Sequence, residues 1–217
     1  MFGSGPAAAA AALKSFPPFL MVASRGLIAG LILTLWAFIE GARSTWREWR
    51  ASFLIGFLIL ACGAGAGTYG QLTVASGVAG VLSALLPLFA AVMGYCVFRE
   101  KLPFRGTVGL VIGFAGIALL LRPGSGLDLF GVAVIVGGQI AWAAGAELSP
   151  RVGLPEEPRL AAGLELLAGG AILLAFSVAF GDLGRLNLAT ASTVSWIGFL
   201  WFIVIAIGGF TAFGYLS

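Results

Sequence analysis

The chain has 217 residues, of which 60% are hydrophobic and only 10% are charged, and its mean hydropathy is +1.06. Soluble domains carry about 25% charged residues, so this composition excludes a water-soluble fold and indicates a protein dissolved in lipid. The net charge of +3 comes from basic residues in short connections rather than in a patch, which argues against nucleic-acid binding.

Histidine is absent, and the two cysteines, Cys62 and Cys96, both lie inside apolar runs. This removes Ser-His-Asp and Cys-His catalysis and imidazole metal sites, and the cysteines have neither metal-ligand nor disulfide spacing. The glycine clusters lack the Lys-Ser or Lys-Thr of a phosphate-binding loop. We therefore expect no enzyme, no metal, no cofactor and no ATP-driven pump.

The predicted elements are membrane spans. Residues 1–13 are too short to cross a bilayer and look like part of a truncated span, and the first complete span is Pro17 to Ile39. The stretch 51–98 contains no acidic or basic residue, and as one helix it would be about 70 Å long, more than twice a bilayer's ~30 Å core. It must therefore fold back as a hairpin at Thr73–Gly77. The further spans are expected at about 52–73, 77–98, 106–121, 128–147, 160–181 and 193–216.

Basic residues are distributed unevenly over the connections. Eight fall on one set of alternate connections and three on the other, with Arg25 inside a span. Because cytoplasmic loops are enriched in Lys and Arg, the first set should be cytoplasmic and Ser217 should end on that side. We expect a multi-pass protein of the cell (inner) membrane. The first set is Arg43, Arg47, Arg50, Arg99, Lys101, Arg105, Arg151 and Arg159, and the second is Lys14, Arg122 and Arg185.

Glycines spaced four apart occur in three of the spans. Small residues in this register let helix backbones approach closely in lipid. Packing within the chain is the main interpretation, and a homodimer interface is the alternative. The pairs are Gly26/Gly30, Gly63/Gly67 and Gly109/Gly113.

The chain also half-repeats itself. Ile-Gly-Phe-Leu at 55–58 recurs at 197–200, and other weak matches follow in the same order at nearly the same offset. Five spans separate the copies, an odd number, so the copies cross the membrane in opposite directions, as in secondary transporters. We predict an all-α polytopic membrane protein built as an inverted repeat of five-helix units. The first repeat is 1–122, with a truncated first helix, and the second is 128–217, without its last two helices.

Three segments carry a more specific pattern: 16–20 followed by Arg25, 76–89 with Pro87 near its end, and 98–102. This pattern resembles the EamA family of the drug/metabolite transporter superfamily, over nearly the whole chain. The resemblance implies ten helices in two inverted five-helix repeats, with both termini cytoplasmic, and export or exchange of small metabolites. It does not imply a particular substrate, because the family handles many.

We therefore expect a secondary transporter, an exporter or exchanger of small organic metabolites such as amino acids or drugs, working by alternating access. Its partners would be the lipid bilayer and the small-molecule substrate. One alternative is a nucleotide-sugar-type antiporter of the same superfamily. Another is a non-transporting membrane channel or scaffold, although the sequence shows neither rings of like charge nor a carbonyl filter.

Arg25, Ser83 and Pro87 are the first candidate substrate-binding residues. Arg25 lies roughly 12 Å inside its span, where a charge costs about 2.5 kcal/mol or more unless it faces a partner or water. It either binds backbone carbonyls and snorkels outward, or lines a cavity and attracts anions. Pro87 lies near mid-span, frees the Ser83 carbonyl and kinks the helix, which suits a substrate contact, a hinge or a simple packing kink.

Further candidates lie at comparable or shallower depth. Gln139 and Trp142 are one helical turn apart and so share a face of the 128–147 span. Tyr69 and Gln71, toward the outer end of their span, would add hydrogen-bonding and aromatic surface to a cavity, or anchor the helix at the interface. Glu165, about 8 Å from the cytoplasmic edge, is the candidate for proton coupling, the alternative being a carboxylate that snorkels to the headgroups.

Overall fold

The computed structural model describes residues 5–99, 104–120, 126–186 and 192–216, and within these ranges it contains helices and no strand. The all-α prediction is confirmed. The helices are α1 (Gly5–Ala12), α2 (Pro18–Ile39), α3 (Trp46–Gly56), η2 (Phe57–Gly65), α4 (Ala66–Gly70), α5 (Ser76–Ser83), α6 (Leu86–Phe98), α7 (Phe104–Leu120), α8 (Leu129–Leu148), η3 (Ser149–Arg151), α9 (Pro158–Ala179), α10 (Asp182–Arg185) and α11 (Thr193–Leu216).

Five helical segments among the described residues are long and apolar enough to cross a membrane. Each corresponds to one predicted span, and α7 and α11 lie where the other two were expected. The turn between Gly70 and Ser76 is the predicted hairpin. The five segments are Pro18–Ile39, Trp46–Gly70, Ser76–Phe98, Leu129–Arg151 and Pro158–Ala179.

The second span begins earlier than predicted, at Trp46 rather than near residue 52. A capping box explains the difference. The backbone N–H of Thr45 donates to Glu48 Oε2 at 2.6 Å, and the Glu48 N–H donates to Thr45 Oγ1 at 3.4 Å. These reciprocal bonds satisfy two of the four free N–H groups of the first turn, so the charged segment is helical as well.

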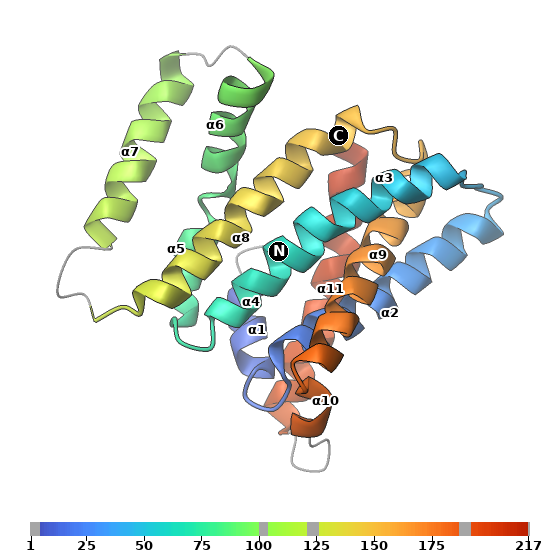
Figure 1. The fold of residues 1–217 in the computed structure, drawn as a ribbon, viewed down its shortest axis with the longest axis horizontal. Helices are drawn as coiled ribbons and strands as arrows, with labels where there is room; N and C mark the ends of the chain where they lie inside the picture. The colour runs from blue at the N-terminus through green and yellow to red at the C-terminus, as the bar shows by residue number, and fades with distance from the viewer. Residues whose placement is uncertain (1–4, 100–103, 121–125, 187–191, 217) are drawn as a thin grey trace.

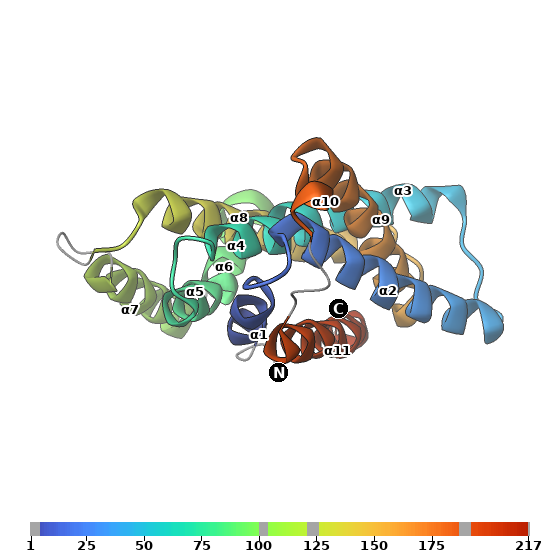
Figure 2. The same cartoon turned by 90° about the horizontal axis from the view of Figure 1, so that it is seen from below.

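The helices form a tightly packed group and a looser one (Figure 1). In the first group α2, α3 and η2 pack against α9, and α11 lies beside α1 beneath α2, as Figure 2 shows. In the second group α6 and α7 stand apart from α2 and α9. Helix α8 joins the two, because it packs against η2 and α4 on one side and against α5 and α6 on the other.

Backbone-to-backbone contact explains the tight group. A Cβ added at Gly30 in α2 would lie 2.8 Å from the Gly163 carbonyl oxygen, and one added at Gly163 would lie 2.4 Å from Thr34 Oγ1. A Cβ at Gly56 would lie only 2.3 Å from the Glu165 carbonyl oxygen. Side chains do not fit between these helices, so only glycine permits the approach.

The glycines of the predicted pairs therefore differ in how closely they pack. Gly26 and Gly30 both lie in close contact with neighbouring helices, and Gly63 lies against Trp142. Gly67 and Gly109 have no atom within 4 Å of an added Cβ, so close packing is not their role among the described residues.

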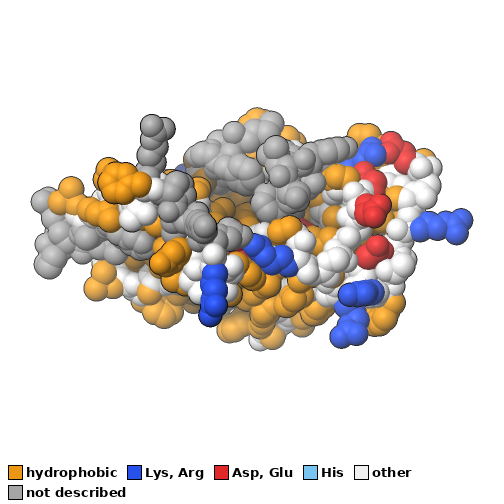
Figure 3. Space-filling view, turned by 90° about the horizontal axis from the view of Figure 1, so that it is seen from above, with side chains coloured by type: hydrophobic (Ala, Val, Ile, Leu, Met, Phe, Trp, Pro, Cys, Tyr) orange, Lys and Arg blue, Asp and Glu red, His pale blue; other side chains and the backbone are white. Residues whose placement is uncertain are grey.

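The helix ends gather into two opposite sets. At one end Arg159, at the start of α9, forms an ion pair with Glu40 at the end of α2, and its guanidinium lies 5.2 Å from the Trp36 ring centroid. The Arg151 guanidinium lies 3.9 Å from the Phe98 ring centroid and so joins the end of α8 to that of α6. Acidic side chains gather at one end of the view in Figure 3.

At the opposite end different loops meet. The Leu20 N–H donates to Asp182 at 3.4 Å, and the hydroxyls of Ser15 and Ser195 are hydrogen-bonded at 2.9 Å. The two sets of helix ends lie at opposite sides of the bundle, as expected for successive spans that cross the membrane in alternating directions. Of the basic residues used for the sequence prediction, Lys101 and Arg122 lie outside the described residues, as do the side chains of Arg105 and Arg185.

Candidate functional site

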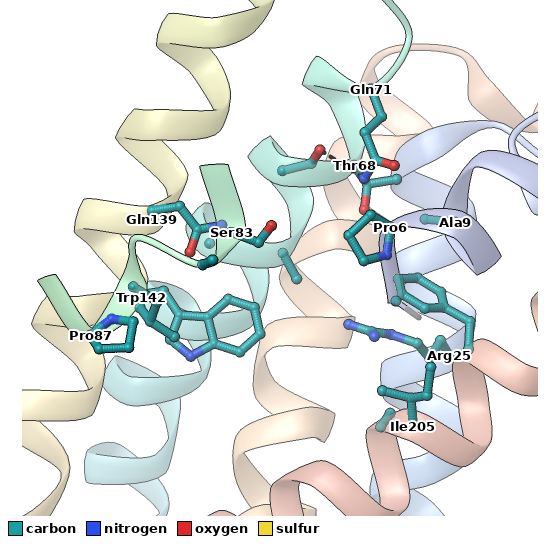
Figure 4. A pocket seen from close by; sticks show the side chains of 18 residues that line it. Pro6, Ala9, Arg25, Thr68, Gln71, Ser83, Pro87, Gln139, Trp142 and Ile205 are labelled. Carbon is teal, nitrogen blue, oxygen red and sulfur yellow. Dashed lines mark hydrogen bonds between the residues drawn. The ribbon is translucent and has the colours of Figure 1, made fainter. Parts of the chain in front are cut away.

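A cavity of about 370 Å³ lies between the two groups of helices. It is lined by residues of α1, α2, η2, α4, α8 and α11 and by the break between α5 and α6 (Figure 4). The volume is typical of small-molecule sites, which measure about 300–1,000 Å³.

The break at Pro87 forms one wall of the cavity. Proline has no N–H to donate to the Ser83 carbonyl, so α5 ends at Ser83 and α6 begins at Leu86. The Leu88 N–H bonds to the Leu85 carbonyl at 2.9 Å, one residue short of the α-helical pattern. Ala84 and Pro87 line the cavity, so the predicted kink is a break of two residues, Ala84 and Leu85, placed at the cavity.

A π-helix forms a second wall. Residues Phe57–Gly65 adopt this wider helix, η2, where the sequence predicted a uniform α-helix, and Gly63 and Ala64 from it line the cavity. A Cβ at Gly63 would lie 3.1 Å from the Trp142 Cβ, so the small residue lets the tryptophan approach. Such π segments are frequent at functional sites. An all-apolar sequence with no periodicity carries no signal for it.

Arg25 lines the cavity and is only 4% exposed. Its Nε and Nη2 are buried and have no hydrogen-bond partner among the described residues, and its guanidinium lies 3.9 Å from the centre of the Phe202 ring. In Figure 4 the guanidinium extends into the cavity, opposite Gln139 and Trp142. A charge in a membrane span costs about 2.5–3.5 kcal/mol, and one desolvated cation–π contact returns about 2 kcal/mol. The charge is therefore only partly compensated by Phe202.

Most of the predicted polar residues also reach this cavity. Gln139 is 5% exposed and lines it together with Trp142, as their shared helix face predicts. Gln71 lines it too, and its Oε1 is buried without a hydrogen-bond partner. The Ser83 hydroxyl donates to the Ala79 carbonyl at 2.8 Å, which leaves its oxygen lone pairs to accept from a ligand.

Tyr69 and Glu165 are placed elsewhere. The Tyr69 ring is 38% exposed and stacks on Phe19 of α2, with ring centroids 5.5 Å apart, and Tyr69 is not among the described residues that line the cavity. Thr68, one residue earlier on the helix, faces the cavity instead. Glu165 is 4% exposed in α9, whose backbone touches Gly56, and it too is absent from the described lining.

Helices α1 and α11 also line the cavity, and no sequence signal predicted their contribution. Pro6 and Ala9 of α1 line the cavity, and so do Phe202 and Ile205 of α11. Phe202 lies in a helix that is apolar on every side, so no periodicity distinguishes it. Its partner Arg25 lies far away in the sequence, and only the fold brings the two together.

The site is thus a mostly apolar cavity with one cationic group and several uncharged polar groups. Such a lining suits reversible binding of a small organic molecule, because apolar walls take up its body and a few polar groups fix its orientation. Three or more metal-ligating side chains do not come together anywhere in the described part of the chain.

Residues 1–122 match the EamA-like transporter family. The chain belongs to that family. It is 34% identical over 174 residues to YedA of Escherichia coli K12, named an uncharacterized inner membrane transporter, a match that covers 78% of this chain and 56% of the relative. It is 27% identical over 175 residues to the uncharacterized transporter YvbV of Bacillus subtilis, covering 76% of this chain and 55% of the relative.

The chain spans a little over half the length of these curated relatives. No solved structure gives a significant match. Family membership and the five apolar spans agree that this is a multi-pass membrane protein of a transporter family.

Proposed function

We propose that this chain carries the substrate-binding cavity of a secondary transporter for small organic metabolites, which works by alternating access. The observation that supports it best is the convergence of Arg25, Gln139 and the Pro87 break on one cavity. A buried charge and a buried carboxamide are expensive in a membrane and are retained where they serve a pathway. Broken helices beside such groups are typical of transporter sites.

The packing suggests how such a cavity opens alternately. Glycine contacts between backbones hold α2, α3 and α9 together, so this group acts as a rigid body. Helix α6 contacts α7 through the Leu88 side chain, whose Cδ2 would lie 3.0 Å from a Cβ added at Gly113. In our proposal α5 and α6 flex at the break next to Pro87, while the rigid body stays fixed.

The membrane orientation and the repeat belong to the same proposal. The end that carries Arg43, Arg47 and Arg159 faces the cytoplasm of the inner membrane, and the chain's last residue lies on that side. Units 1–122 and 128–217 are inverted repeats, with the cavity between them. Export or exchange is the direction that we propose, and Glu165 as a coupling residue stays a prediction.

The experiment is transport by the chain in proteoliposomes, screened with pooled labelled metabolites. We expect Arg25→Ala and Gln139→Leu to lower the rate of transport about tenfold or more, per molecule of folded protein, because each removes a contact inside the cavity. Thr107→Leu on α7 is the control, since Thr107 is exposed and outside the described lining. Wild-type rates in both cavity variants would contradict the proposal.

A further inference from the structure

The charge balance of the cavity indicates which substrates it accepts. Among the described residues that line it, Arg25 is the only one with a formal charge, and no aspartate or glutamate is present. Arg25 is 4% exposed, and two of its three guanidinium nitrogens are buried without a hydrogen-bond partner among the described residues. A buried cation without a counter-charge stabilises any anion placed beside it.

The surroundings of Arg25 leave its donors available. Phe202 covers one face of the guanidinium at 3.9 Å, so a ligand would meet the group at its planar edge, and in Figure 4 the guanidinium extends into the cavity. That planar edge matches a carboxylate, which accepts two parallel hydrogen bonds from it. The C-terminal end of α5 and the N-terminal end of α6 meet at the same wall, so their opposed dipoles largely cancel, and Arg25 carries the formal charge of the described lining.

The opposite wall suits the rest of such a molecule. Trp142 offers an aromatic surface and Gln139 a carboxamide, and in Figure 4 both lie across the cavity from Arg25. Gln71 also lines the cavity, and in Figure 4 it lies on the side of Thr68 and Pro6. The lining is therefore bipolar, with a cationic end and an uncharged, aromatic end.

We propose that the substrates of this cavity are small organic monocarboxylates, held by Arg25 through the carboxylate, and that organic cations are excluded. This inference rests on the proposed function. One guanidinium balances one negative charge, so the cavity does not suit a nucleotide sugar, whose diphosphate carries two. An organic cation would meet an uncompensated positive charge of its own sign at close range, with no carboxylate in the described lining to offset it.

The test uses three labelled probes with the same body and different charge: 3-phenylpropionate, 3-phenylpropionamide and 3-phenylpropylamine. Their equilibrium binding is measured on the purified full chain in lipid nanodiscs. We expect the carboxylate to bind at least about tenfold more tightly than the amide, as a charge-assisted bidentate contact implies, and the amine to bind most weakly.

Three variants localise the effect. Arg25→Met should weaken carboxylate binding by about tenfold or more and leave amide binding within about twofold of wild type, because only the charge-assisted contact is lost. Lys14→Met removes the same charge at an exposed site and should keep the wild-type preference. Arg25→Lys should retain part of the preference, since it keeps the charge and loses the bidentate geometry.

Carboxylate binding no tighter than amide or amine binding in the wild type would overturn the inference, and this comparison holds even where Arg25→Met fails to insert. An unchanged carboxylate preference in folded Arg25→Met would overturn it as well. Transport separates the two proposals. Uptake of the amine or amide without the carboxylate would refute the substrate class and leave the transporter, whereas carboxylate binding without any transport would refute the transporter and leave the anion site.

Discussion

Filling the cavity from one glycine should block transport without unfolding the protein. Gly67 in α4 lines the cavity, and a Cβ added there meets no atom within 4 Å. Gly67→Leu adds four carbon atoms, which occupy roughly 100 Å³ if each takes a little less than the ~30 Å³ of a liquid water molecule. That is roughly a quarter of the 370 Å³ cavity.

The cost to a bound substrate follows from overpacking. A ligand that needs the lost volume is destabilised by about 1–3 kcal/mol, which is roughly a 5- to 150-fold loss of affinity. Substrates that nearly fill the cavity should lose most and the smallest should lose least. Protein stability should not fall, because replacing glycine with leucine in a helix gains up to about 1 kcal/mol, the Cβ meets no atom within 4 Å, and the rest of the side chain has the cavity to occupy.

The assay is uptake into proteoliposomes for substrates of increasing size, normalised to folded protein by size-exclusion chromatography. Gly137→Leu on α8 is the matched control, since its Cβ also meets no atom within 4 Å and Gly137 lies outside the described lining. Equal uptake by Gly67→Leu and Gly137→Leu across the size series would show that the substrate does not use the space beside Gly67.

Three further predictions concern packing, orientation and pH. Gly56→Ala should lower the free energy of unfolding by about 1–3 kcal/mol, because its Cβ would lie 2.3 Å from the Glu165 carbonyl oxygen, whereas Gly137→Ala should be neutral or stabilising. Thermal unfolding in detergent compares the two variants, and equal stabilities would contradict close backbone packing at Gly56. In a background without Cys62 and Cys96, an impermeant thiol reagent should label Leu72→Cys but not Arg47→Cys in intact cells, and the reverse pattern would invert the proposed orientation. Hydrogen bonds lower the pKa of Glu40, the larger effect coming from Arg159 and the smaller from Trp36. The ionised carboxylate therefore stabilises the fold above the unfolded-state pKa, and this stabilisation is lost as the pH falls through the folded-state pKa. Glu40→Gln should therefore melt at a lower temperature than wild type at neutral pH, and the difference should vanish on acidification; a difference that persists at low pH would show that the charge is not its cause.

The spans, and the helix face that Gln139 and Trp142 share, could be predicted because both depend on spacing along one helix. The charge-free stretch 51–98 is too long for one crossing, and Gln139 and Trp142 share a face by helical geometry alone. The rotation of each helix about its axis could not be predicted, because uniformly apolar sequences have no periodicity to orient them. This is why Tyr69 was expected in the cavity, where Thr68 lies instead.

Contacts between distant segments were equally inaccessible. The Arg25–Phe202 contact joins α2 to α11, and η2 departs from α-helical geometry without a sequence signal. The start of α3 is different, since the Thr45-x-x-Glu48 capping box is a sequence signal that places it before the apolar run. Local chemistry was thus available in the sequence, while the tertiary partners of the buried charge were not.

Protection of a cavity cysteine by substrate shows directly whether the cavity is the substrate site. Ser83→Cys, in a background without Cys62 and Cys96, places a thiol on the cavity wall beside the break, and Tyr95→Cys places one on the exposed part of the same span as a control. The rate of alkylation by a small neutral reagent is measured with and without a saturating transported compound. We expect the compound to slow alkylation at position 83 by about tenfold or more and to leave the rate at position 95 unchanged, as occupancy of the cavity requires. Equal rates at position 83 with and without a compound that the same preparation transports would contradict it.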